Sequence, residues 1–405
     1  MHERQVYAMK VVFISNYFNH HQAPFSEAMN KLTNGNYWFV AVEEMSEERK
    51  NMGWEHDNLP DYVIKSYKSK ESLDYAKRKI EEADTVIFGL SGWKNFKLIQ
   101  KRLRQKKLTF RYSERIYKAG FKWHRFPIQA LKHWLVGGRC RCLYMLCASA
   151  YTAQDYAKTG CYLNRTYKWG YFPKIRWYDV DELMVKKLSA KSDEWKHPCA
   201  SILWVGRLIE WKHPDASIRL AAALKEKGYS FKLSIIGNGE MERQLHDMIR
   251  DKNLDDRVEM LGAMSPDEVR EHMEGADIYL FTSDFNEGWG AVLNESMNSG
   301  CAVVASHAIG AVPFLIKNTV NGLVYQNGDE CHLETQVRRL LDDKNYRDQM
   351  GREAYKTIIN MWNADNAANR FLMLAQSLQK GNGADLFSDG PCSKAQIIKN
   401  NWFTC

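Results

Sequence analysis

The sequence lacks the features that would place it across a membrane or outside the cell. No run of eighteen or more apolar residues occurs, so no membrane-spanning helix is predicted. The opening segment, MHERQVYAMKVVFISNY, has neither the basic flank and continuous apolar stretch of a signal peptide nor its small-residue cleavage site. These absences favour a cytoplasmic protein.

The sequence also lacks the cysteine pattern of a disulfide framework. The cysteines are an odd number spread through a long chain: Cys140, Cys142, Cys147, Cys161, Cys199, Cys301, Cys331, Cys392 and Cys405. Small secreted domains instead carry an even number at close spacing. Free thiols are therefore expected. Cys140, Cys142 and Cys147 have no second pair at finger-like spacing, so a zinc site is not predicted there.

Acidic residues are scarce in one stretch. Between Lys94 and Arg141 there are fifteen Lys and Arg residues and a single acid, Glu114, although the formal charge of the whole chain is only +8. Aromatic residues interleave with these cations. Such a stretch can lie on an anionic membrane at the inner face, and a solvated basic face is the alternative. A nucleic-acid partner is not expected, since no other feature supports one.

The chain is long enough, at 405 residues with 45% hydrophobic residues, to form more than one domain. In its first half, apolar runs alternate with helical patterns, beginning with KVVFIS and a helix over 23–32. Further strands are predicted over 37–42, 62–66, 85–89, 108–112 and 143–148. Alternating strands and helices indicate a parallel α/β sheet.

The alternation breaks over residues 174–198 and restarts at Ser201. ILWVG, FKLSIIG, VEMLG, IYLFTS and AVVAS are predicted strands, and the helix from Ser265 opens with a capping box formed with Glu268. Residues 330–379 are predicted to be helical. The expected organisation is a disordered extension (1–8), a first domain (9–175), a linker (176–200), a second domain (201–361), a helix returning to the first domain (362–380) and a tail (381–405).

Two carboxylates flank a glycine-rich turn in FTSDFNEGWGAVLNESMNSG. Glu287 follows an apolar strand, and Glu295 lies on the helix expected to begin near Gly288 or Gly290. Eight residues of helix separate them by about 12 Å, too far for a shared proton but suited to the two ends of one ligand. Gly288 and Gly290 allow close approach to a diphosphate at the helix start. Surface acids at a helix terminus are the alternative explanation.

Two cations follow an earlier strand in VGRLIEWKHPD. Arg207 and Lys212 can stabilise the negative charge of a departing diphosphate without a metal. Solvated loop charges are the alternative. Gly237 and Gly239 in IIGNG are consistent with phosphate contact or, equally, with a tight turn.

Taken in order, these motifs, together with LGAMSPDEV, GAVPFLI and NGLVY, make residues 201–325 resemble the donor-binding half of glycosyltransferase family 4, the retaining enzymes of GT-B fold. The resemblance implies two Rossmann-like, doubly wound α/β domains facing a cleft, with C-terminal helices crossing back. It implies that Glu287 contacts the transferred sugar, Arg207 and Lys212 the diphosphate, and Glu295 the ribose. The sugar or phosphate would be contacted around the turn Gly288, Trp289, Gly290, Ala291 and Val292.

The first domain departs from that family's pattern. SNYFNHHQAPF stands where the family has a glycine-rich loop, and places His20, His21 and Gln22 at the presumed acceptor side. Glu114 stands about where many members have a histidine, and is the candidate for a polar contact to the acceptor or donor sugar. Asp179 and Asp181 spell D-x-D, a metal-binding pattern, but no buried strand leads into it, and a helix N-cap explains it better.

The resulting hypothesis is metal-independent, retaining transfer of a sugar from a UDP-sugar or GDP-sugar to a saccharide or lipid-linked saccharide in cell-surface polysaccharide synthesis. A nucleotide-sugar epimerase or hydrolase of the same fold and a non-catalytic scaffold remain alternatives.

Overall fold

The computed structural model describes residues 6–47, 59–89, 96–118, 120, 123–189, 199–382 and 385–404. The chain forms two compact units. Unit 1 contains residues 1–174 and 361–399, and unit 2 contains residues 175–360 and 400–405. Each is organised around its own parallel sheet.

Unit 1 has a seven-stranded parallel sheet in the order β3-β2-β1-β4-β5-β6-β7. Its strands are β1 (Val11–Ser15), β2 (Tyr37–Ala41), β3 (Val63–Lys65), β4 (Thr85–Phe88), β5 (Thr109–Ser113), β6 (Leu143–Cys147) and β7 (Thr166–Lys168). Every residue of β1 and β4 is buried, as expected for central strands covered on both faces. The strand order reverses between β1 and β4.

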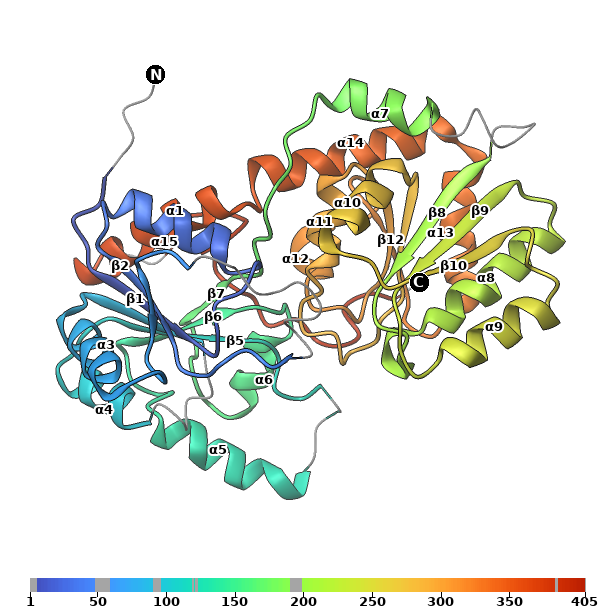
Figure 1. Cartoon of the computed structure of the whole chain (residues 1–405). Helices are drawn as coiled ribbons and strands as arrows, with labels where there is room; N and C mark the ends of the chain where they lie inside the picture. Colours follow the sequence, from blue (N-terminus) through green and yellow to red (C-terminus); the bar gives the residue numbers. More distant parts are fainter. Residues whose placement is uncertain are drawn as a thin grey trace. The chain divides into compact units, whose positions relative to one another are not determined.

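The helices of unit 1 are α1 (Ala23–Leu32), α3 (Lys70–Glu82), α4 (Phe96–Arg104), α5 (Phe126–Leu135) after the 3-10 turn η1 (Trp123–Arg125), α6 (Thr152–Lys158) and α15 (Ala364–Gln379). Figure 1 shows α1 and α15 side by side over the sheet, although they lie at opposite ends of the sequence. The helix predicted to return to the first domain corresponds to α15, which belongs to unit 1.

The two ends of unit 1 are more ordered than the sequence indicated. Residues 1–8 were predicted to be a disordered extension, yet Tyr7 is buried and its hydroxyl donates to Asn369 Oδ1 at 2.8 Å. Residues 1–5 lie outside the described chain. The tail, which has no sequence period, pairs with β7 through reciprocal backbone and side-chain bonds between Thr166 and Ala395. It covers a sheet edge that would otherwise be unpaired.

Unit 2 has a six-stranded parallel sheet in the order β10-β9-β8-β11-β12-β13. Its strands are β8 (Ala200–Val205), β9 (Phe231–Ile236), β10 (Val258–Gly262), β11 (Ile278–Phe281), β12 (Ala302–Ser306) and β13 (Leu323–Tyr325). Its helices are α7 (Val180–Ser189), the 3-10 turn η2 (Glu210–Lys212), α8 (Pro214–Glu226), α9 (Glu242–Asp251), α10 (Pro266–Gly275), α11 (Val292–Asn298), α12 (Val312–Leu315), α13 (Glu330–Asp342) and α14 (Lys344–Asn360). The order reverses between β8 and β11.

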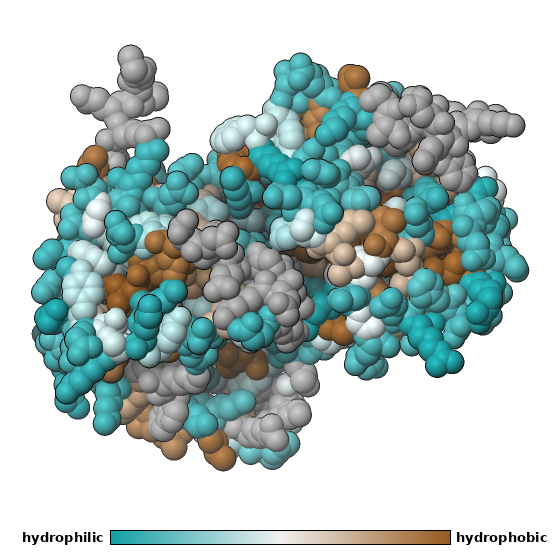
Figure 2. Space-filling model, in the orientation of Figure 1, coloured by the Kyte–Doolittle hydropathy of each residue, from teal (hydrophilic) through white to brown (hydrophobic). Residues whose placement is uncertain are grey.

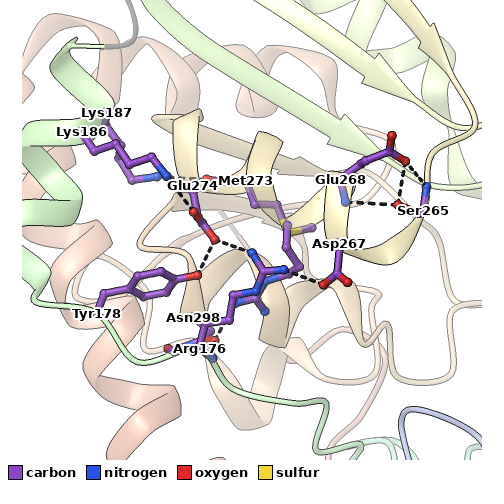
Figure 3. A network of polar contacts seen from close by, with 11 residues as sticks. Arg176, Tyr178, Lys186, Lys187, Ser265, Asp267, Glu268, Met273, Glu274 and Asn298 are labelled. Atoms are coloured by element: carbon purple, nitrogen blue, oxygen red, sulfur yellow. Dashed lines mark hydrogen bonds and ion pairs between the residues drawn. The ribbon is translucent and has the colours of Figure 1, made fainter.

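The segment predicted as a linker is part of unit 2, as far as the structure describes it. Glu274, buried on α10, accepts from Arg176 Nη1 at 2.7 Å, Tyr178 OH at 2.6 Å and Lys186 Nζ at 3.0 Å. Figure 3 shows these side chains converging from the stretch before α7 and from α7 itself. Lys187 Nζ donates to the carbonyl oxygens of Met273 and Ala276 at the end of α10. The expectation failed because these partners lie about ninety residues further along the chain.

The basic stretch between Lys94 and Arg141 is divided between core and surface. Arg102 is buried and donates to the carbonyl oxygens of Ile80 and Leu108. Arg111 and Arg115 are also buried, beside tyrosine hydroxyls and Asp155 respectively. These three arginines are structural, so the stretch as a whole is not a solvent-facing basic surface. Lys94 and Phe121 lie outside the described residues.

Candidate functional site

The loops after β8 and β11 meet where the strand order of unit 2 reverses. In doubly wound sheets, ligands bind beyond the carboxyl ends of the strands at such a reversal. Lys212 ends the 3-10 turn after β8, and Glu287 lies in the loop after β11. The structure thus brings together two of the residues that the sequence singled out.

Glu287 and Lys212 form a direct ion pair. Lys212 Nζ donates to Glu287 Oε2 at 2.6 Å, and Ser283 Oγ donates to the same oxygen at 3.1 Å. Both charged side chains are largely buried, with exposed fractions of 14% and 11%. Charge-assisted bonds are stronger where solvent is limited, so the pair is held in a defined geometry.

Further contacts between the same two loops fix that geometry. Thr282 Oγ1 donates to the Lys212 carbonyl at 2.7 Å and accepts from the buried indole of Trp204 at 2.8 Å. The Asp284 amide donates to the carbonyl of Trp211 at 3.0 Å. Sequence reasoning missed Thr282, Asp284 and Trp211, because nothing in their local pattern reveals partners about seventy residues away.

His213 extends this connection between the loops. It has a left-handed backbone (φ 49°) at the start of α8, and its Nε2 lies 3.7 Å from Asp284 Oδ2. The neighbouring Asp284 carboxylate raises the pKa of His213. Burial alone would raise the pKa of Asp284, but the nearby His213 and the hydrogen bonds from Asn286 outweigh burial and lower it. The pair therefore favours the charged state of both groups.

Arg207 has no carboxylate partner among the described residues. Its side chain is exposed, and its guanidinium carbon lies 5.9 Å from the ring centre of Trp211. Lys212 Nζ lies 4.9 Å from the same ring centre. The two predicted cations therefore flank one aromatic ring, and only Lys212 is neutralised by Glu287.

The turn between Glu287 and α11 presents backbone rather than side chains. Trp289 is fully buried and its indole nitrogen donates to Asn294 Oδ1 at 2.9 Å, so its ring belongs to the core. Gly290 has φ 89°, and a Cβ there would lie 2.4 Å from the ring of Phe281. The helix begins at Val292, two to four residues later than the predicted start near Gly288 or Gly290. Within the described chain, the amides of Gly290, Ala291 and Val292 have no backbone acceptor.

Gly237 is required by the contact between two strand-end loops. A Cβ at this position would lie 1.8 Å from the carbonyl oxygen of Gly206. The Gly237 amide donates to the Gly262 carbonyl at 2.7 Å. At Gly239 a Cβ would lie 2.4 Å from the Leu208 carbonyl oxygen. Close packing between the loops explains why both positions are glycine. This agrees with the tight-turn alternative rather than requiring phosphate contact.

Glu295 is a partly exposed carboxylate on α11 with no hydrogen-bond or ion-pair partner in the part of the chain that the structure describes. Burial raises its pKa to about 7, although the charges of Arg270 and Arg176 act to lower it. A partly exposed carboxyl group that has no donor in the described chain, and whose pKa is raised by burial, is suited to accept hydrogen bonds from a ligand.

In unit 1, Glu114 lies immediately after β5 and contacts a tyrosine of another loop and a lysine of its own. Its carboxylate accepts from Tyr171 OH at 2.7 Å and from Lys118 Nζ at 2.5 Å. The ring of His21 stacks against Tyr171 at 6.1 Å between centres. Tyr171 therefore connects two predicted residues, Glu114 and His21, that come from different strand ends. No local sequence pattern singles out Tyr171.

The loop after β1 lies where the strand order of unit 1 reverses. His20 and His21 have ring centres 3.8 Å apart, and burial together with the charge of His20 lowers the pKa of His21 to about 3. Gln22 Nε2 donates to Ser15 Oγ at 2.9 Å, while Gln22 Oε1 is enclosed with no donor among the described residues. A small pocket here is lined by Phe13, His21, Gln22, Phe25, Tyr112, Trp169, Gly170, Tyr171 and Phe172.

The D-x-D sequence is a helix cap, as predicted. Asp179 Oδ1 accepts from the amides of Asp181 and Glu182 at the start of α7. Asp181 pairs with Arg352. Both carboxylates are therefore committed to structure. Among the described residues, no three His, Cys, Asp or Glu side chains gather in a metal-binding arrangement.

Comparison with known proteins finds a family match within unit 2. Residues 186–357 match the family described as "Glycosyl transferases group 1". The amylovoran biosynthesis glycosyltransferase AmsK of Erwinia amylovora is 34% identical over 160 residues, which cover 38% of this chain and 39% of that protein.

A second relative is similar to this chain over a segment of about the same length. The N-acetylgalactosamine-N,N'-diacetylbacillosaminyl-diphospho-undecaprenol 4-alpha-N-acetylgalactosaminyltransferase of Campylobacter jejuni is 31% identical over 155 residues, 38% of this chain and 40% of that protein. The chain thus spans about two fifths of the length of these curated relatives.

Among solved structures, HepE of Anabaena in complex with UDP matches 92% of this chain and 100% of its own, with a TM-score of 0.67 and 14% identity. Sucrose-phosphate synthase of Thermosynechococcus elongatus matches 92% and 99% with a TM-score of 0.60 and 16% identity. The fold is therefore GT-B, built of two Rossmann-like α/β domains.

Proposed function

We propose that the protein is a retaining glycosyltransferase that moves a sugar from a UDP-sugar or GDP-sugar to a saccharide or lipid-linked saccharide in cell-surface polysaccharide synthesis. The observation that carries this proposal is the Glu287–Lys212 pair at the strand-order reversal of unit 2. It lies inside the segment that matches group 1 glycosyl transferases. The AmsK and C. jejuni relatives, one acting in amylovoran biosynthesis and the other named for a diphospho-undecaprenol-linked substrate, support this acceptor class.

In this proposal the donor binds to unit 2 through groups of both charges. Arg207 and Lys212 stabilise the diphosphate as negative charge develops on it, and the amides of Gly290 to Val292 contribute donors. Glu287 accepts from hydroxyls of the transferred sugar and Glu295 from those of the ribose. These cations supply the charge compensation, so the proposed reaction requires no metal.

Transfer then proceeds on one face of the sugar. The acceptor hydroxyl oxygen forms a bond to the anomeric carbon, and the bond from that carbon to the β-phosphate oxygen breaks. The proton of the acceptor hydroxyl passes to the departing phosphate oxygen. Glu287 binds rather than attacks, because its carboxylate is held by Lys212 and Ser283. On the acceptor side, Glu114, His20, His21 and Gln22 of unit 1 are the proposed contacts.

The proposal is tested first by melting the protein with a panel of UDP-sugars and GDP-sugars and then by transfer with the donor that stabilises it. Glu287→Gln should lower transfer by about a hundredfold or more, because the ion pair and the anionic acceptor are lost. Glu210→Gln changes an exposed acid two residues before Lys212 and serves as the matched control.

Near-normal transfer by Glu287→Gln at an unchanged melting temperature would contradict the central assignment. Rapid consumption of donor without acceptor would identify a hydrolase or epimerase instead. Donor binding without any turnover, across a range of saccharide and lipid-linked acceptors, would favour the non-catalytic scaffold.

A further inference from the structure

The helix α5 of unit 1 exposes large apolar side chains. It runs from Phe126 to Leu135, and Ala130 is its buried residue. The exposed apolar residues of η1 and α5 are Trp123 (79%), Ile128 (61%), Leu131 (52%), Trp134 (41%) and Leu135 (44%). We refer to these five side chains as the α5 face. A surface helix ordinarily turns such residues inward.

Three residues of the α5 face form a stripe along the helix. Ile128, Leu131 and Leu135 are spaced i, i+3, i+7, so they lie on one side of the helix, and Trp134 flanks them. Hydrophobic atoms reach the surface at the lower edge of the view in Figure 2, where Figure 1 places α5. Scattered exposed apolar residues are common, but a stripe of this kind marks an interaction surface.

Cations surround the α5 face. Lys132 is exposed within the helix, and the Arg139 guanidinium lies over the Trp134 ring at 4.0 Å. Gln100 donates to the Leu135 carbonyl at 2.5 Å, which places α4 beside the end of α5. On α4, Lys97 and Arg104 are exposed, whereas Lys101 pairs with Glu81 of α3. The single acid of the stretch, Glu114, is already paired with Lys118.

We propose that the α5 face binds an anionic lipid bilayer, with α5 lying along the membrane surface. Its apolar stripe would enter the interface, the tryptophans would lie at the headgroup level, and the flanking cations would contact lipid phosphates. At 10 residues, or about 15 Å, α5 is too short to span the hydrocarbon core. No helix in the described ranges combines the length and hydrophobicity needed to cross a membrane.

The positive charge beside the α5 face favours an anionic lipid surface over a protein as its binding partner. An apolar stripe bordered by cations, with the stretch's one acid committed elsewhere, complements a surface of uniform negative charge. This binding does not depend on glycosyl transfer. It would place unit 1, which carries the proposed acceptor contacts, where lipid-linked saccharides reside.

The test is sedimentation of the full chain with vesicles of phosphatidylcholine alone or mixed with phosphatidylglycerol, at low and high salt. The wild type should bind the mixed vesicles at low salt and lose binding at high salt. The double variant Ile128→Asn, Leu131→Asn should bind about tenfold less, because two apolar side chains no longer leave water. Val185→Asn alters an apolar helix residue of α7 that is 62% exposed, and is the matched control.

Melting temperatures of all variants establish that each is folded, and Trp123→Ser provides a second, single change outside α5. Unchanged binding by both α5-face variants, or equal binding to neutral and anionic vesicles, would overturn the proposal. A wild type that ignores lipid but self-associates in size-exclusion chromatography, with the α5-face variants monomeric, would assign the face to a second copy of the chain instead.

Discussion

Lys212 holds Glu287 in place, and the proposed donor has to be accommodated around this pair. Because both side chains are largely buried, removing the lysine leaves a carboxylate with only the Ser283 hydroxyl as partner. An uncompensated buried charge is costly, whereas an exposed ion pair contributes little.

Lys212→Met should therefore lower the free energy of unfolding by about 3 kcal/mol and abolish transfer. Lys225→Met removes a lysine paired with the exposed Asp256 and should change stability by less than about 1 kcal/mol. Chemical denaturation measures both. Equal effects from the two substitutions would show that the Glu287 pair is no stronger than a surface pair.

Glu295 gives a pH-dependent prediction. Burial raises its folded pKa to about 7, so this carboxyl group favours the folded state below its ordinary pKa, and the contribution is lost as the pH rises through 7. Glu295→Gln should remove this loss of stability between about pH 5 and about pH 8. Denaturant midpoints at both pH values measure it, with the exposed Glu242→Gln as control. An unchanged slope would mean that Glu295 is solvated.

At the scale of elements, α7 and the residues before it depend on one carboxylate of α10. Glu274→Gln should lower the free energy of unfolding by about 3 kcal/mol, since it weakens three bonds to a buried acceptor. Glu271→Gln changes an exposed acid of the same helix and should have little effect.

The Glu274 effect also has a defined pH dependence. Burial would raise the pKa of Glu274, but hydrogen bonds from Tyr178, Lys186 and Arg176 lower it below its ordinary value. The stability it contributes is present above the ordinary carboxyl pKa and is lost as the pH falls through the folded pKa. The wild type should therefore lose more stability than Glu274→Gln on acidification. Parallel acid unfolding curves would contradict this.

Local patterns predicted the elements well and the contacts between them poorly. The helix over Ala23–Leu32 and the capping box of Ser265 and Glu268 are confirmed, because both depend on neighbouring residues. The short strand β7, the packing of α7 and the bond from Asp284 to Trp211 were missed. Each depends on partners that only the folded chain brings together.

At the scale of the molecule, the chain enters unit 2 at Ile175, returns to unit 1 at Met361, and ends on unit 2. The last segment packs on two histidines of unit 2: Trp402 Nε1 donates to the His307 carbonyl at 3.3 Å, and Phe403 stacks on His332 at 6.0 Å. His307 in turn contacts Phe285, two residues before Glu287.

Phe403→Ala should lower the free energy of unfolding of unit 2 by about 2 kcal/mol, through the loss of aromatic contacts. Ile397→Ala, at a position of the same tail that is 61% exposed, should be neutral. Thermal melting monitored by tryptophan fluorescence compares them. If both melt like the wild type, the segment contributes nothing to unit 2.

The close approach at Gly237 has a thermodynamic consequence for ligand binding. This residue touches the loop after β8 and bonds to the end of β10, so three strand-end loops are locked together before any ligand arrives. Ordering loops on binding costs conformational entropy, and a preorganised edge avoids that cost. If the proposed nucleotide donor binds at this edge, its association should show little entropic penalty by calorimetry, whereas a side chain at position 237 would force the loops apart and restore that penalty.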